Sequence, residues 1–187
     1  MSVLRVKRNR TVKNKILIFV ESKTEETYLN SWRQLNKSSS VKIVKIKGTG
    51  RYIIKTVLSK LSNDKSLRDY KNSRKIVVFD KDELSVDELQ SIQKHAKLYA
   101  IELGFSNICF EVWLLAHYER MSKSKLSTEM LNTKLGQYLH TTYKKGDSKQ
   151  LDAIASNYEI AIENAEPIAE ISFDGQCTNV GKILNSI

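Results

Sequence analysis

The sequence has little of what marks secreted, membrane-bound or zinc-stabilised proteins. Its 187 residues include one proline and two cysteines, and Cys109 and Cys177 have neither the CxxC spacing of a zinc site nor the number that a disulfide scaffold needs. No run of about eighteen apolar residues is present, and charges stand where a signal peptide needs an apolar segment. We expect a cytoplasmic protein, not inserted in a membrane, with two reduced thiols.

Acidic residues are scarce relative to basic ones. There are 21 Asp and Glu against 31 Lys and Arg, which gives a formal net charge of +10 and favours polyanionic partners such as nucleic acid. The excess is largest in residues 1–14, which we predict to be a basic arm that binds phosphates. Its alternative role is that of a solubilising tail. The basic residues that precede the first acidic one are Arg5, Lys7, Arg8, Arg10, Lys13 and Lys15.

Apolar runs and helical patterns alternate over the first two-thirds of the chain. The predicted strands are 15–20, 41–46, 75–79 and 99–103, and the predicted helices are 24–36, 53–61 and 86–97. Thr24 is a plausible cap for the first helix. Because helices separate the strands, we predict an α/β fold with an open, mainly parallel sheet of about four strands, flanked by helices. The run 41–46 alternates apolar and basic residues, which indicates an edge strand.

The remainder of the chain, from about residue 107, is predicted to be helical. The predicted helices are 110–118, 126–138 and 151–165, and no strand is predicted after Ser106. The last helix has one apolar stripe, which is either ordinary core or a face for a partner. With no linker or repeat, residues 15–187 are expected to form a single domain.

Acidic residues follow two of the predicted strands. Glu21 and Asp80 come where these strands end, and ligands of open parallel sheets collect at this edge. Asp82 lies two residues after Asp80, so in an extended segment both carboxylates point the same way. Glu25, one helical turn after Glu21, is a candidate for a second metal position about 3.5–4 Å from the first. Carboxylates suit Mg²⁺, although Glu25 is also well placed to complement the helix dipole.

These acidic segments resemble two signature motifs of Toprim domains, a superfamily that includes topoisomerases, primases and nucleases. The matching segments are Glu21-Ser-Lys-Thr-Glu25 and Phe79-Asp-Lys-Asp-Glu83. Further segments, in the same order, resemble the RloB-like family over nearly the whole chain. They are Lys47-Gly-Thr-Gly50, Ser106-Asn-Ile-Cys-Phe-Glu-Val-Trp-Leu-Leu115, Tyr143-Lys-Lys-Gly-Asp147 and Thr178-Asn-Val180.

The resemblance implies a Toprim-like fold, use of Mg²⁺ or Mn²⁺, and a role in bacterial anti-phage defence (abortive infection or restriction-associated loci) beside a partner ATPase of the ABC or AAA type. It places the metal on residues matching Glu21, Asp80 and Asp82, and in the nuclease branch also Glu25. The chain departs from the family pattern at Ser22, where glycine is common, and at Ile108, where proline is usual. Ser22 can instead cap the helix that follows.

Other residues of the family-like segments are candidates either for a role at the metal site or for a purely structural role. Glu111 is a candidate metal ligand or the buried partner of a lysine or arginine. His117 lies about 240° around the helix from Glu111 and is expected to be a structural histidine. Asn107 is expected to hold the turn that leads into this helix, and Lys182 is a candidate for stabilising a leaving group.

The sequence therefore predicts a metal-dependent nuclease of DNA or RNA, in which Glu21, Asp80 and Asp82 position the ion. A metal-bound water or Glu21 itself is the expected base. A non-catalytic nucleic-acid-binding or sensor subunit is the alternative, and phosphotransfer to a small molecule is a third class. Oligomerisation is compatible with the sequence, which does not specify the state.

Overall fold

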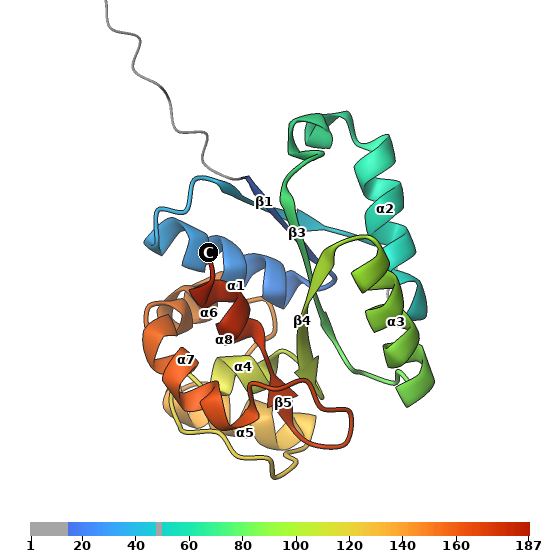
Figure 1. Cartoon of the computed structure of the whole chain (residues 1–187). Coiled ribbons are helices and arrows are strands. Elements are labelled where there is room, and N and C mark those ends of the chain that lie inside the picture. The colour runs from blue at the N-terminus through green and yellow to red at the C-terminus, as the bar shows by residue number, and fades with distance from the viewer. Residues whose placement is uncertain (1–14, 48–49) are drawn as a thin grey trace, which may run out of the picture.

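The computed structural model describes residues 15–47 and 50–187, which form a five-stranded sheet with helices on both faces (Figure 1). The strand order is β2-β1-β3-β4-β5, and the first four strands are parallel. These strands are β1 (Ile16–Val20), β2 (Val41–Lys45), β3 (Arg74–Asp80) and β4 (Ile101–Asn107). The predicted open, mainly parallel sheet flanked by helices is confirmed, with β2 at one edge.

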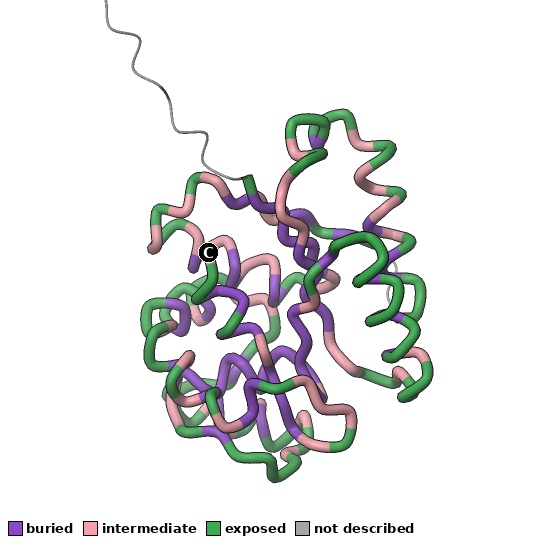
Figure 2. Tube along the Cα trace, in the orientation of Figure 1, coloured by how far each residue is buried: buried purple, intermediate pink, exposed green. Residues whose placement is uncertain are grey.

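Strand β1 shows why an uninterrupted apolar run forms a central strand here. All five of its residues are buried, and successive side chains point to opposite faces of the sheet. Ile16, Ile18 and Val20 pack in one hydrophobic cluster, whereas Leu17 and Phe19 pack in another. The sheet thus separates two cores, and its strands form the buried centre of the molecule (Figure 2).

The helices divide unequally between the two faces of the sheet (Figure 1). Leu17 and Phe19 face α2 (Ile53–Asn63) and α3 (Val86–Leu98), whose buried side chains belong to the same cluster. On the opposite face lies α1 (Lys23–Leu35) together with the helices of the C-terminal part. These are α4 (Glu111–Leu115), α5 (Thr128–Tyr138), α6 (Ser148–Ala155), α7 (Tyr158–Ala165) and α8 (Val180–Asn185).

Capping side chains determine where the first helix begins. Ser22 is the N-cap of α1: its Oγ accepts a hydrogen bond from the backbone N–H of Glu25, and Glu25 accepts one in return from the backbone N–H of Ser22. The expectation that Thr24 is the cap was wrong, because Thr24 is buried within the first turn. The alternative role foreseen for Ser22 is the observed one.

Several predicted boundaries differ from the structure, and the expectation of no strand after Ser106 was wrong. Strand β4 begins two residues later than expected and extends to Asn107, and a short fifth strand, β5 (Cys177–Thr178), pairs antiparallel with it. The helix predicted over 151–165 is two helices, α6 and α7, while the helix predicted over 110–118 is the single short helix α4. Helix α8 was not predicted. The apolar stripe of 151–165 lies in the core, so its reading as core is confirmed.

The structure also bears on two expectations drawn from what the sequence lacks. Across the described parts of the chain, no helix combines the length and the apolarity that crossing a bilayer requires. Cys109 and Cys177 are both buried and free.

Candidate functional site

The carboxyl ends of β1 and β3 bring the predicted acidic residues to one edge of the sheet. β1 and β3 are parallel neighbours in which Val20 pairs with Val78, so Glu21 follows its strand close to where Asp80 ends the next one. An open pocket of about 640 Å³ lies at this edge. Its lining residues are Glu21, Gly50, Arg51, Tyr52, Asp80, Asp82, Glu83, Leu84 and Glu88.

Two carboxylate oxygens in this pocket are buried without a hydrogen-bond partner among the described residues. They are Oε1 of Glu21 and Oδ1 of Asp80. Burying an unpaired charged group is costly, and native proteins normally pair it with a donor, a cation or a metal. The two orphan oxygens are therefore the strongest local sign that this pocket binds a positively charged group.

Glu25 supports Glu21 rather than facing the pocket freely. Its Oε2 accepts hydrogen bonds from the backbone N–H groups of Glu21 and Ser22, each at 2.9 Å, and the side chain is 1% exposed. Glu25 thus closes the capping box of α1 and fixes the backbone that carries Glu21. Within residues 15–47 and 50–187 no hydrogen bond to its other oxygen is found, and its part in metal binding stays a prediction.

The backbone conformation that places Asp82 at the pocket differs from the expected one. The segment after β3 was predicted to be extended, with Asp80 and Asp82 pointing the same way. Instead Asp82 lies in a turn with a φ of +41°, where the backbone N–H of Leu84 donates to the carbonyl of Lys81. The turn still places Asp82 in the pocket lining, and its side chain is more exposed than that of Asp80.

Burial, and after it the clustering of acids, makes the ionisation of these carboxyl groups unfavourable. Burial, followed by the negative charges of Glu25 and Asp82, raises the pKa of Glu21 to about 8. Burial likewise raises the pKa of Glu25 to about 7, although the hydrogen bonds from the backbone of Ser22 and Glu21 oppose the shift. The pKa of Asp80 is raised well above its ordinary value, by burial first and then by the neighbouring carboxylates. A bound cation would reverse these shifts.

Glu111 is a further carboxylate near the site, and it is paired with a lysine, which is one of the two roles predicted for it. It is 2% exposed; Nζ of Lys145 lies 3.3 Å from its Oε1, and the hydroxyl of Tyr143 donates to the same oxygen at 3.2 Å. Burial opposes the charge of Lys145, but the charge and hydrogen bond of Glu111, together with the neighbouring Cys109 and Asp80, outweigh it and raise the pKa of Lys145. Lys145 therefore brings a positive charge to the acidic cluster.

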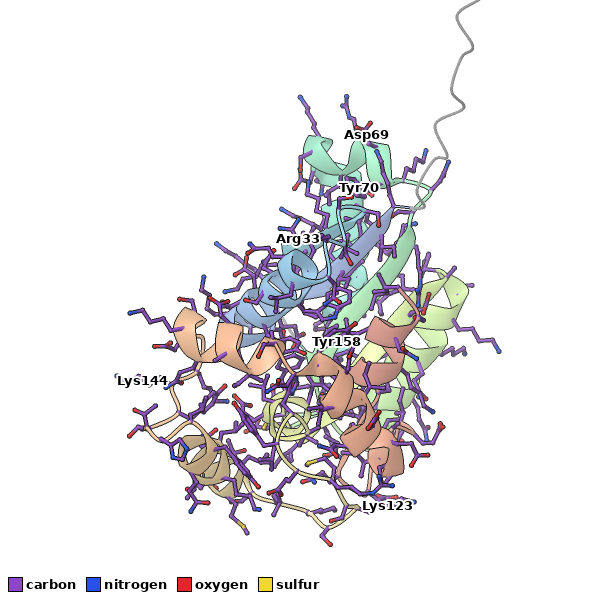
Figure 3. The ribbon with its side chains drawn as sticks, turned by 90° about the vertical axis from the view of Figure 1, so that its left-hand side faces the viewer. Arg33, Asp69, Tyr70, Lys123, Lys144 and Tyr158 are labelled. Carbon is purple, nitrogen blue, oxygen red and sulfur yellow. The ribbon has the colours of Figure 1, made fainter. Side chains whose placement is uncertain are left out.

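Sequence reasoning missed Lys145 as a site residue. The signal was present in the family-like segment Tyr143-Lys-Lys-Gly-Asp147, but nothing local distinguishes its two lysines. In the structure they differ plainly: Lys145 pairs with Glu111, whereas Lys144 extends away from the body of the protein (Figure 3).

Two other candidates lie away from the pocket. Asn107 does not hold the turn before α4 as expected; its Nδ2 donates to the carbonyls of Ser172, Phe173 and Gly175, which fixes that distant loop beside β4. Lys182 pairs with Glu170 and does not line the acidic pocket, so its expected role at a leaving group finds no support in this geometry.

His117 is a structural histidine, as expected. Its Nε2 is 2.9 Å from the hydroxyl of Tyr28, its Nδ1 lies 3.1 Å from the carbonyl oxygens of Trp113 and Leu114, and the side chain is buried. Burial lowers its pKa to about 4.

The predicted basic arm lies outside the described residues. Arg5, Lys7, Arg8, Arg10 and Lys13 are therefore untested as a nucleic-acid-binding segment. Lys15, the first described residue, precedes β1 at the edge of the sheet opposite the acidic pocket, where its ammonium lies 5.0 Å from the centre of the Tyr70 ring.

The side chains as they stand do not form a ready-made metal centre. Within 15–47 and 50–187, no group of three or more His, Cys, Asp or Glu side chains is arranged to hold a metal ion. For Glu21, Asp80 and Asp82 to hold a metal together, their side chains would have to rearrange. Of these, Asp82 is exposed and is the freest to move.

Fold and site together define an α/β protein with an acidic pocket at the carboxyl edge of a parallel sheet. Residues 16–187 match the sequence model of a family described as RloB-like protein, and the chain belongs to this family. No curated protein and no solved structure matches the chain.

Proposed function

We propose that the acidic pocket binds Mg²⁺ or Mn²⁺ and cleaves phosphodiester bonds in a nucleic acid. The observation that carries this proposal is the pair of buried, unpartnered oxygens on Glu21 and Asp80, which two adjacent strands bring to one pocket. Hard carboxylate oxygens are the ligands that these ions prefer, and the chemistry of the donor set fits them.

Each residue has a distinct part in this mechanism. Glu21, Asp80 and Asp82 would hold the ion, which when bound supplies Lewis-acid activation of the phosphate and of an attacking water. Glu25 fixes the backbone of Glu21. Lys145, kept charged by Glu111, would stabilise negative charge that develops on the phosphate or the leaving oxygen.

The net charge of +10 supports nucleic acid as the substrate, because phosphate backbones attract basic proteins. From the family resemblance we further propose a role in bacterial anti-phage defence, together with a partner ATPase. Separate reactions with DNA and with RNA determine which of the two is the substrate.

A cleavage assay tests the nuclease proposal. The full-length protein is incubated with Mg²⁺ or Mn²⁺ and, in separate reactions, plasmid, single-stranded DNA and tRNA, with and without the partner ATPase. Asp80→Asn and Glu21→Gln should lose cleavage, whereas Asp69→Asn should retain it because Asp69 is exposed at a distant end of the molecule (Figure 3). Equal cleavage by all the proteins, or none by any of them, contradicts the proposal.

A second pair of variants isolates the role of Lys145. Removing one group that stabilises transition-state charge typically costs about 100-fold in turnover. Lys145→Ala should show a loss of this order, while Lys144→Ala, its outward-pointing neighbour, should cleave normally. Equal rates for the two variants would assign Lys145 to a structural role only.

Within the described residues the acidic side chains are not arranged to hold a metal ion, and this favours one alternative, a nucleic-acid-binding or sensor subunit without catalysis. This alternative predicts that nucleic acid binds equally well to wild type and to Asp80→Asn, with no metal-dependent cleavage by either.

A further inference from the structure

A second groove continues from the acidic pocket and runs between α2 and α3. Its volume is also about 640 Å³, and it shares Arg51, Tyr52 and Glu88 with the acidic pocket. Ile54, Leu58 and Ile92 give it an apolar floor. A molecule held by the acidic pocket can therefore extend directly into this groove.

Two aromatic side chains that line the groove are unusually exposed for their size. Tyr52 is 54% exposed and Tyr99 is 47% exposed. The guanidinium of Arg51 lies over the Tyr52 ring, 4.8 Å from its centre, so a cation contacts one face of this exposed aromatic side chain. Aromatic rings accompanied by arginine are the usual platform for unpaired nucleobases.

Lysines gather on the other side of α2. A groove of about 560 Å³ between β2 and α2 is lined by Lys45, Lys47, Lys55 and Lys60, and Lys55 also lines the aromatic groove. Lys60 is paired with Asp64 at 3.0 Å; the other three have no ion pair with any acidic residue in the described segments. These three charges suit the phosphates of a chain that passes over α2.

We propose that a single strand of nucleic acid crosses the start of α2, with one unpaired base stacked on Tyr52 in the groove between α2 and α3. Phosphates on one side of that nucleotide contact Lys45, Lys47 and Lys55. This inference rests on the proposed function, since the adjacent acidic pocket then receives the phosphate to be cleaved. A single strand is specified because a base inside a duplex is already stacked and cannot lie on a protein ring.

Binding in the absence of metal tests the inference separately from catalysis. Fluorescently labelled single-stranded DNA and RNA oligonucleotides are titrated with the full-length protein in EDTA, and anisotropy is measured. Stacking on one aromatic side chain is worth about 1–3 kcal/mol, so Tyr52→Ala should weaken binding about 5- to 150-fold. Tyr52→Phe should bind like wild type, because it keeps the ring.

Tyr138→Ala is the matched control, since Tyr138 is also exposed, at 40%, but lies on α5 outside the groove. An abasic oligonucleotide removes the stacking partner, so on this probe Tyr52→Ala and wild type should bind equally. Lys55→Ala should weaken binding to both probes and reduce the salt dependence.

The inference is overturned if wild type does not bind single strands, if Tyr52→Ala binds as wild type does, or if its defect persists on the abasic probe. The last result would show that Tyr52 contacts the sugar-phosphate backbone or maintains the groove, and that it does not stack on a base. If Tyr52→Ala binds single strands as wild type does while Asp80→Asn abolishes cleavage, the stacking inference fails and the nuclease proposal stands. If Tyr52→Ala weakens binding but wild type does not cleave, the protein binds nucleic acid without cleaving it.

Discussion

Replacing Glu21 by glutamine should stabilise the metal-free protein, although Glu21 is proposed to be essential. Its pKa is about 8 in the folded protein against an ordinary value of 4.5. The folded state therefore holds this proton more tightly than the unfolded state does, and stability falls as the pH rises from about 4.5 through about 8. At pH 7 the difference corresponds to about 3 kcal/mol, which Glu21→Gln should recover in large part.

Urea unfolding in EDTA at pH 7 measures this gain. Glu83→Gln is a suitable control, because Glu83 lines the same pocket but is exposed, and its replacement should change stability by less than about 0.5 kcal/mol. Added Mn²⁺ should then reverse the order: at about 100 times the dissociation constant it stabilises wild type by about 2.7 kcal/mol and the Glu21→Gln variant much less. A variant that is less stable than wild type in EDTA, or that gains equally from Mn²⁺, would refute the reasoning.

Three further predictions concern the scaffold. Neutral, buried His117 contributes stability that is present above its unfolded pKa of about 6.5 and is lost as the pH falls toward about 4, so His117→Gln should show a shallower acid-side loss in thermal melts; an unchanged slope would contradict this. Gly146→Ala should cost about 1 kcal/mol in urea unfolding, because its φ is +72° and a Cβ would meet Cγ of Lys23 at 2.9 Å; a stabilised variant would show that the left-handed conformation is not required. Gly181→Ala should cost about 1–3 kcal/mol by overpacking against the Trp113 ring, 2.9 Å from the added Cβ, and an unchanged melting temperature would mean that the ring yields freely.

The sheet was predictable because local patterns specify it. An uninterrupted apolar run such as β1 can be satisfied only when both faces are covered, and helices between the strands impose parallel pairing. The shared edge of Glu21 and Asp80 follows from that topology alone. That these two side chains lie in one pocket was therefore predictable from the order and direction of the strands, without a measured interatomic distance.

Pairings between distant segments were not predictable. Lys145 and Glu111 are 34 positions apart, and Asn107 bonds carbonyls 65 to 68 positions away. The two residues of β5 are too few to show an alternating pattern, and the break between α6 and α7 is hidden because the apolar stripe continues in phase across it. Asp82 was misplaced because its positive φ has no signal in the sequence.

The most direct test of the central claim is a crystal of the protein soaked in Mn²⁺, with anomalous diffraction used to locate the ion. We predict a peak in the acidic pocket within coordination distance of Glu21 and Asp80, with Asp82 turned toward it, and no such peak in Asp80→Asn. A pocket without manganese in the wild-type crystal, or a peak that persists in the variant, would contradict metal binding by these carboxylates.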